Sequence, residues 1–399
     1  MTCVGVSTKF GRTGGIRSGL MILGAITSMV AFVYCSSGGD GGGGTTTNNT
    51  TPPPAGSSNQ FAYVIDSGSS QIQAYTLDGN GNLTAVGSAM PTGAFPHHVD
   101  VEPLGRFVYV SNHNATFVSG WRINQDGSLA PMNPAPGSPV TGSDPTENEP
   151  HSSVVDQTGQ FLYVVAGTGA STLRAYTINA STGLPTFIQN PTPQSFPVGI
   201  HAHNITISPN NQFLYVACED SNEVRAFSRN TSTGALTAAG TVAGITGATA
   251  VRVNPQNTFL YAAHVNAVDV FAIQNNGSLT TPGSTFPTNT NGTGSGPHSM
   301  VMHPNGQSLY TANLNSATIS VFSVNSGTGA LTEIQVPNPK TGTDPNYIAI
   351  HPNQKFAFTA NAVTNDVSRF TINADGTLTA NGTIPAGLGA NGINTTNFP

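Results

Sequence analysis

The stretch "GIHAHNITISPNNQFLYVACED", residues Gly199–Asp220, contains two short apolar runs separated by a polar segment that begins at Pro209. The second run, Phe213–Cys218, is almost continuously apolar, which is typical of a strand buried on both faces. The stretch therefore predicts two strands joined by a turn. Near its start lies His201-Ala202-His203, whose role depends on where this segment lies in the fold.

The same pattern recurs along the whole chain. An aromatic residue takes the same place in each repeat, at intervals of 46 to 54 residues: Tyr63, Tyr109, Tyr163, Tyr215, Tyr261, Tyr310 and Phe358. Around it the chain reads QFAYV, RFVYV, QFLYV, QFLYV, TFLYA, QSLYT and KFAFT. A further strand such as TISVFSVN (Thr318–Asn325), a glycine turn such as QDGSL and a weaker strand follow. Glycine supplies the positive φ that such a tight turn needs.

A strand that ends in proline precedes most of these runs, as in PHHVDVEP, HNITISP, VRVNP and YIAIHP. Four strands per unit and seven units predict an all-β fold, a seven-bladed β-propeller of four-stranded blades over residues 61–399. The repeats begin in mid-unit, because SNQF (Ser58–Phe61) matches NNQF (Asn210–Phe213). We expect the C-terminal GANGINTTNFP to add the missing strand to the N-terminal blade, which closes the ring and removes free sheet edges.

Charged residues make up only 8% of the chain, against roughly 25% in an average soluble protein. Residues 36–399 contain nine basic and 18 acidic residues, so the formal net charge of this part of the chain is −9. Nucleic acid selects basic surfaces and is therefore excluded as the expected partner. Cys218 is the one cysteine of the repeats. It cannot form a disulfide within them and is expected to be a buried apolar filler rather than a nucleophile.

Residues 1–35 have the composition of an export signal, with three basic residues before the mostly apolar run Gly19–Tyr34. Cys35 follows, and residues 36–60 read as a flexible linker rich in Gly, Thr, Asn and Pro. This layout resembles that of bacterial lipoproteins, in which lipid on such a cysteine attaches the protein to the outer membrane or the cell surface. Tyr34 departs from the small residue usual before that cysteine. A plain cleaved signal and an uncleaved anchor therefore remain alternatives.

Histidine recurs at one position of the predicted blades. A proline ends the first strand of most blades, and Gln157 takes its place in the third unit. The sixth residue before it is His97, His151, His203, Thr249, His298 or Asn346. The loops on the same face carry His98, His113, His201 and His264, so eight of the ten histidines are expected at one mouth of the central channel. His303 and His351 are expected at the opposite face.

Two interpretations of the histidine ring stand side by side. Imidazole suits proton transfer and metal binding near neutral pH. However, an ancestral histidine that only bonded the neighbouring blade would also recur after duplication. Glu219 is a candidate base or acid, or a solvated loop carboxylate, and Arg252 is a candidate anion ligand or a partner in an ion pair. The chain has no G-x-S-x-G, H-E-x-x-H or P-loop sequence.

Two longer stretches carry a resemblance to a known family. PHSMVMHPNGQSLYTANLNSATISVFSVNSGTGALT (Pro297–Thr332) and TGTDPNYIAIHPNQKFAFTAN (Thr341–Asn361) resemble the seven-bladed propeller lactonases, typified by 6-phosphogluconolactonase and the carboxy-muconate cyclases. The fourth unit of that family carries Pro-His-Ala-His, matched here by His201-Ala202-His203 with Ile200 in place of the proline. This resemblance implies lactone hydrolysis with a histidine base.

The chain departs from the family pattern in its charged residues. The fifth unit lacks the family's arginine and glutamate, and has Gly247–Ala250 and His264–Asn266 in their places. The sixth unit has Asn313-Leu314-Asn315 where the family has another arginine, and His113 stands where a glutamate is common. Arginines of this kind hold anionic substrates, so their absence predicts a neutral or weakly charged lactone.

The leading hypothesis is a lactonase in which His203 is the general base and His201, His151 and Glu219 assist. The expected binding residues are His97, His113, His264, His298, Asn313, Asn346 and Arg252. One alternative is a non-catalytic cell-surface propeller that binds a small molecule or a protein. A second is a divalent transition-metal site formed by His97, His151 and His203. A closed ring needs no partner subunit, so a monomer is expected.

Overall fold

The computed structural model describes residues 60–132, 139–140, 149–189, 195–280, 284–288 and 295–397. The predicted export signal, Cys35 and the linker up to residue 59 lie outside the described residues. Within the described ranges, no helix is long and apolar enough to cross a membrane.

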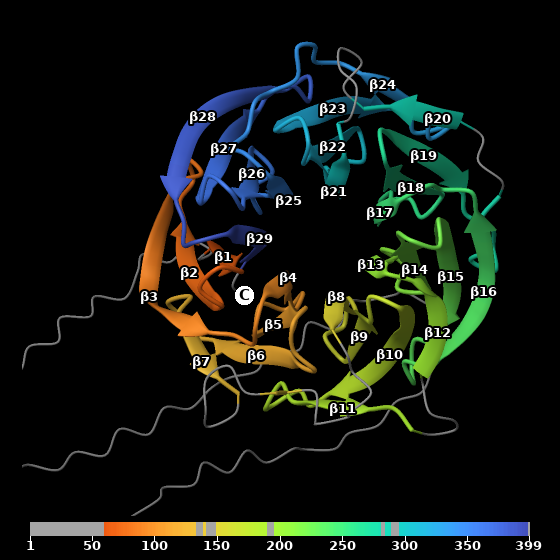
Figure 1. Cartoon of the computed structure of the whole chain (residues 1–399), viewed down its shortest axis with the longest axis horizontal. Coiled ribbons are helices and arrows are strands. Elements are labelled where there is room, and N and C mark those ends of the chain that lie inside the picture. Colours follow the sequence, from red (N-terminus) through yellow and green to blue (C-terminus); the bar gives the residue numbers. More distant parts are fainter. Residues whose placement is uncertain are drawn as a thin grey trace, which may run out of the picture. The chain divides into compact units, whose positions relative to one another are not determined.

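Seven sheets surround a central axis, as predicted (Figure 1). The first blade contains β29 (Ala390–Asn397), β1 (Gln60–Asp66), β2 (Gln71–Leu77) and β3 (Leu83–Pro91). The second contains β4 (Pro96–Val101), β5 (Phe107–Asn112), β6 (Val118–Ile123) and β7 (Leu129–Pro131). The third contains β8 (Pro150–Val155), β9 (Phe161–Ala166), β10 (Ala170–Ile178) and β11 (Pro185–Phe187), with β12 (Ser195–Ile200) as an additional strand paired with β10.

The other four blades repeat the plan. The fourth contains β13 (Ala202–Ile207), β14 (Phe213–Cys218), β15 (Glu223–Arg229) and β16 (Leu236–Ala243). The fifth contains β17 (Ala248–Val253), β18 (Phe259–His264), β19 (Ala267–Ala272) and β20 (Ser284–Pro287). The sixth contains β21 (Pro297–Met302), β22 (Ser308–Asn313), β23 (Thr318–Val324) and β24 (Leu331–Glu333). The seventh contains β25 (Pro345–Ile350), β26 (Phe356–Asn361), β27 (Asp366–Ile372) and β28 (Leu378–Pro385).

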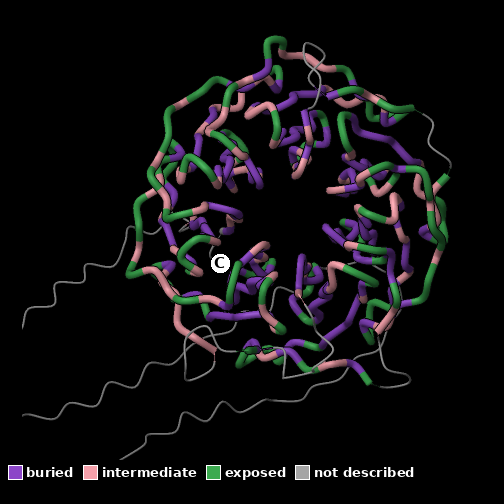
Figure 2. The backbone as a smooth tube through the Cα atoms, in the orientation of Figure 1, coloured by how far each residue is buried: buried purple, intermediate pink, exposed green. Residues whose placement is uncertain are grey.

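The ring closes as expected, because the last strand completes the first blade. β29 pairs antiparallel with β1, with Tyr63 opposite Asn394. The second strand of most blades is buried at every position, as in β14, whereas an outer strand such as β16 exposes five of its eight residues. Figure 2 shows the exposed residues concentrated on the outer strands and loops. The apolar repeats in the sequence are therefore the walls between blades.

The recurring aromatic residues join each blade to the next. The tyrosine hydroxyl donates a hydrogen bond to the carbonyl of the turn glycine in the following blade, at 2.7 to 3.1 Å: Tyr63 to Gly127, Tyr109 to Gly183, Tyr163 to Gly234, Tyr215 to Gly277 and Tyr310 to Gly376. In four of these five blades a phenylalanine two residues before the tyrosine packs on the same glycine, and in the sixth blade Ser308 takes its place. A Cβ on Gly127 would lie 2.3 Å from the ring of Phe61. With a φ of +85°, this turn therefore requires glycine for both space and conformation.

Two blades lack this hydrogen bond. Phe358 has no hydroxyl, and the buried hydroxyl of Tyr261 has no hydrogen-bond partner among the described residues. Both rings are nevertheless fully buried. Apolar packing is thus common to all seven repeats, and the hydrogen bond is an addition in five of them.

We expect Tyr109→Phe to lower the free energy of unfolding by about 1–2 kcal/mol, because the buried carbonyl of Gly183 loses its donor. Tyr261→Phe is the matched control and should change the free energy by less than about 0.5 kcal/mol, because its hydroxyl makes no bond to lose. Urea unfolding of the two variants and the parent protein measures the difference. Equal losses in both variants would contradict this account of the blade contacts.

Candidate functional site

The histidine ring lies at an irregularity shared by all the innermost strands. In each blade, the pairing of the first strand with the second skips one residue near its start, and that residue is His97, His151, His203, Thr249, His298, Asn346 or Asn391. Such a bulge redirects a side chain out of the regular alternation. The position counted from the prolines in the sequence is therefore a bulge position, and Asn391 is its seventh member.

The ring histidines bond from blade to blade. Nδ1 contacts the backbone carbonyl of the ring residue in the next blade: His97 to His151 at 3.1 Å, His151 to His203 at 3.2 Å, His203 to Thr249 at 2.8 Å and His298 to Asn346 at 3.1 Å. A carbonyl oxygen can only accept, so Nδ1 carries the proton in each case. Nε2 of each neutral ring is then left with a lone pair.

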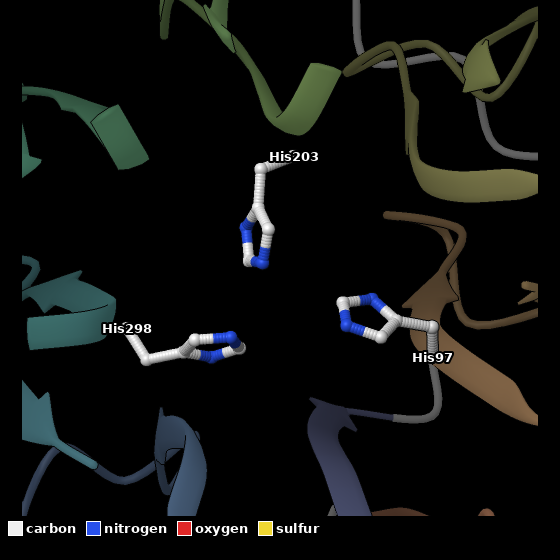
Figure 3. A group of neighbouring side chains, drawn as sticks. All are labelled: His97, His203 and His298. Carbon is white, nitrogen blue, oxygen red and sulfur yellow. The ribbon is translucent and has the colours of Figure 1, made fainter. Parts of the chain in front are cut away.

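The side chains of His97, His203 and His298 point toward one another in the channel (Figure 3). One ring nitrogen from each lies within 4.8 Å of the others. We call these three residues the inner group. Burial is the first cause that lowers the pKa of each ring, and for His97 and His203 repulsion from His298 is the second. The inner group is therefore neutral at neutral pH.

His113, His151 and His201 form an adjacent outer group, whose ring nitrogens also lie within 4.8 Å of one another. Nε2 of His201 lies 3.2 Å from Nε2 of His151. On its other side, Nδ1 of His201 lies 3.4 Å from Oε2 of Glu219 and 3.6 Å from Oδ2 of Asp220. Nδ1 of His113 is 3.0 Å from Oδ1 of Asn114.

The inner and outer groups touch. The ring centroids of His97 and His151 are 3.9 Å apart, and those of His151 and His203 are 4.6 Å apart. Burial, followed by the charge of neighbouring histidines, places the pKa of His151 well below its usual value. The six imidazoles therefore form one continuous array, which we call the six-histidine cluster.

Two of the eight histidines expected at this mouth lie outside the six-histidine cluster. Nε2 of His264 lies 3.3 Å from Asp269 of its own blade. His98 follows the bulge, points further along the channel and bonds the hydroxyl of Tyr347. His303 and His351 lie near the opposite end, where His351 bonds the carbonyl of Asp78 in a turn between outer strands.

Two other predicted binding residues take structural or distant positions. Asn313 is fully buried and donates to Thr318 and Ser320 within its own blade. Arg252 donates to Asn204 at 3.0 Å and lies 3.5 Å from the hydroxyl of Tyr347, away from the cluster. These placements follow from side-chain direction, which alternates along a strand and cannot be read from loop position.

Asn346 lies against the inner group, because its carbonyl accepts the bond from His298 and its side chain lines a small cavity with His97 and His203. The expected metal trio of His97, His151 and His203 is divided by the structure. His97 and His203 belong to the inner group and His151 to the outer one.

Cys218 is fully buried in β14, as expected. Burial raises the pKa of its thiol to about 12. The thiolate is thus scarcely populated at neutral pH, and Cys218 is a filler of the core rather than a nucleophile.

The further end of the channel widens into a cavity of about 490 Å³, which His98, Asp100, Arg252 and Tyr347 help to line. Burial raises the pKa of Asp100 to about 7, although its carboxylate accepts a bond from the amide of Val155. Burial and then Arg252 lower the pKa of His98 to about 3. The sequence repeats gave no signal for Asp100 or Tyr347, because neither occupies the ring position.

We expect Asp100→Asn to flatten the pH dependence of stability between about pH 4 and 7. A carboxyl whose pKa is raised in the folded state binds more protons there than in the unfolded chain, so it makes the free energy of unfolding fall as pH rises through this window. The asparagine oxygen can still accept the bond from Val155. The variant should therefore gain stability relative to the parent by about 1 kcal/mol per pH unit, screening included, as measured by urea unfolding at pH 5, 6 and 7. A constant difference across the window would contradict the shift.

The sequence of this chain is similar to those of known proteins. The family model described as lactonase, 7-bladed beta-propeller, matches residues 43–339. The 6-phosphogluconolactonase of Bacillus subtilis (strain 168) is 27% identical over 301 residues, which cover 71% of this chain and 83% of that protein.

Solved structures share the fold. The periplasmic gluconolactonase of Pseudomonas aeruginosa superposes with a TM-score of 0.67 at 19% identity, over 86% of this chain and 99% of its own. A protein from Lactobacillus plantarum gives a TM-score of 0.69 at 18% identity, over 85% of this chain and 99% of its own.

Proposed function

This chain belongs to the lactonase family of seven-bladed β-propellers, and on that premise we propose that it hydrolyses a neutral or weakly charged lactone at the six-histidine cluster. The observation that carries the proposal is the fixed state of His203. Its Nδ1–H is committed to the carbonyl of Thr249 at 2.8 Å, so Nε2 is a free base inside the channel. The residue occupies the second histidine of the His-Ala-His stretch that resembles the family's own.

In the proposed reaction, Nε2 of His203 takes a proton from water as the water oxygen attacks the lactone carbonyl. The ring C–O bond then breaks, and the leaving oxygen recovers that proton to give the hydroxy acid. A general base must be unprotonated to begin this cycle. The lowered pKa of His203, caused first by burial, favours that state at neutral pH.

His201 and His151 act as positioning residues in this proposal. Glu219 lies beside Nδ1 of His201, and its backbone amide donates to the carbonyl of His201 at 2.9 Å. This loop therefore holds the ring of His201 against His151. Orientation of this kind reduces the entropy that the reaction must lose when substrate and water meet.

The charge around the cluster supports an uncharged substrate. Glu219 and Asp220 both lie within 3.6 Å of His201. Within the described ranges, the hydrogen bonds and ion pairs of the six imidazoles include no arginine or lysine. The carboxylates of Glu219 and Asp220 would repel a phosphate group bound here, and no arginine or lysine among the bonds of the six imidazoles offsets this repulsion.

The N-terminal sequence supports action outside the cytoplasm. Residues 1–35 have the basic and apolar segments of an export signal, and Cys35 is the proposed site of lipid attachment. The closed ring supports a monomeric enzyme.

We expect the purified full-length protein to hydrolyse glucono-δ-lactone at least about ten times more efficiently than its 6-phosphorylated form. His203→Asn should lower kcat about 10²- to 10⁴-fold, as loss of a general base does. Asparagine can keep a bond to the next blade, because Asn391 at the equivalent position bonds Pro96 of the blade that follows it, while Nε2 is lost. Initial rates, corrected for spontaneous opening of the lactone, give both comparisons.

His303→Asn is the control for this experiment, because His303 lies away from the cluster and bonds Gln354. It should keep the parent activity. Preference for the phosphorylated lactone would overturn the substrate assignment. Full activity in His203→Asn, or no hydrolysis of either lactone by the parent protein, would overturn the proposed function.

A further inference from the structure

We propose that the six-histidine cluster is a paired centre for transition-metal ions. The inner group (His97, His203 and His298) would hold one ion, and the outer group (His113, His151 and His201) the other. The inference concerns binding and does not depend on the proposed lactone hydrolysis, which uses Nε2 of His203 as a base and therefore refers to the metal-free protein.

The first argument is that all six Nδ1 atoms face an oxygen. Four lie within hydrogen-bond distance of backbone carbonyls of the next blade, and His113 and His201 face Asn114 and Glu219. Metal-bound histidines usually donate their second ring nitrogen to a carbonyl or a carboxylate in this way, because the bond fixes the tautomer and the ring direction. Every ring of the cluster thus directs Nε2 as its available ligand atom.

The second argument is the contact between Nε2 of His151 and Nε2 of His201, at 3.2 Å. With the protons on both Nδ1 atoms, two lone pairs face each other, which is repulsive unless a cation lies between them. Two imidazoles bound to one zinc at 2.0–2.1 Å in tetrahedral geometry have their nitrogens about 3.3 Å apart. The observed spacing matches that of two ligands on one ion, and an N–H···N hydrogen bond would give the same distance.

The third argument compares the ring histidines with the asparagine at the same position. Asn391 bonds the carbonyl of Pro96, the residue before the ring position of the next blade, through Nδ2 and so joins the two blades without an imidazole. Joining the blades therefore does not require histidine. What histidine adds at His97, His151, His203 and His298 is Nε2, directed into the channel.

Charge and geometry also suit a metal. Burial lowers the pKa of His97, His151, His203 and His298, so these rings are neutral ligands at neutral pH. Glu219 and Asp220 supply negative charge beside the outer group. A ligand set made of imidazoles favours zinc, copper or nickel over calcium or magnesium. Three ligands per ion leave a coordination position open to water or a small molecule.

The test is metal binding by the full-length protein, purified without a histidine tag and stripped with EDTA. After addition of Zn²⁺ and removal of the excess, elemental mass spectrometry should find two equivalents. Co²⁺ in place of Zn²⁺ should give the visible absorption of tetrahedral nitrogen sites.

Two paired variants separate the sites. His97→Asn/His298→Asn should lose the inner ion and keep one equivalent, and His113→Asn/His201→Asn should lose the outer ion and keep one. Each loss should raise the corresponding Kd at least 100-fold. His303→Asn/His351→Asn removes two histidines distant from the cluster and should keep two equivalents.

Circular dichroism and urea unfolding establish that each variant is folded before its metal is counted. Fewer than 0.2 equivalents in the parent protein would overturn the proposal. So would a stoichiometry that the cluster variants do not change, or one that the distant pair reduces equally. A single equivalent that only one cluster variant removes would overturn the paired centre. Metal binding by a protein whose metal-free form does not hydrolyse the lactones would leave this inference standing and refute the proposed function alone.

Discussion

The contact between each second strand and the glycine turn of the next blade is the constraint on which the rest of the structure depends. In six of the seven blades an aromatic ring packs where a Cβ of that turn glycine would be, and in five blades a tyrosine hydroxyl reaches the glycine carbonyl. This contact sets the angle between neighbouring sheets. Because the ring must close with β29 on β1, the same angle has to recur around the whole circle. The innermost strands are thereby brought to one common radius.

The histidine cluster is a product of that common radius. A bulge at the start of each innermost strand releases one side chain from the regular alternation, and the ring brings these seven side chains together. The backbone carbonyl of a bulge residue faces the ring-position side chain of the preceding blade. Where that side chain is histidine, its Nδ1 donates a hydrogen bond to this carbonyl. Burying polar rings costs free energy unless they are hydrogen-bonded, and these bonds offset much of that cost. The structural and chemical uses of histidine thus coexist, because they employ different nitrogens of one ring.

The two ends of the channel differ in chemistry. One end carries neutral imidazoles with carboxylates beside them, whereas the other carries Arg252, Asp100 and Tyr347 around an open cavity. A ligand with negative charge would find Arg252 at the second end.

The sequence by itself determined the propeller, the number of blades, the ring closure and the shared position of the histidines. Each of these depends on periodic local features, such as apolar runs, turn glycines and closing prolines, which the chain repeats seven times. The sequence could not show that His264, His98, Asn313 and Arg252 bond to partners outside the six-histidine cluster, because the strand or loop that holds a residue does not fix the direction of its side chain. It also could not divide the six clustered histidines into two groups. That division joins different blades, and only the closed tertiary structure decides which side chains meet across the channel.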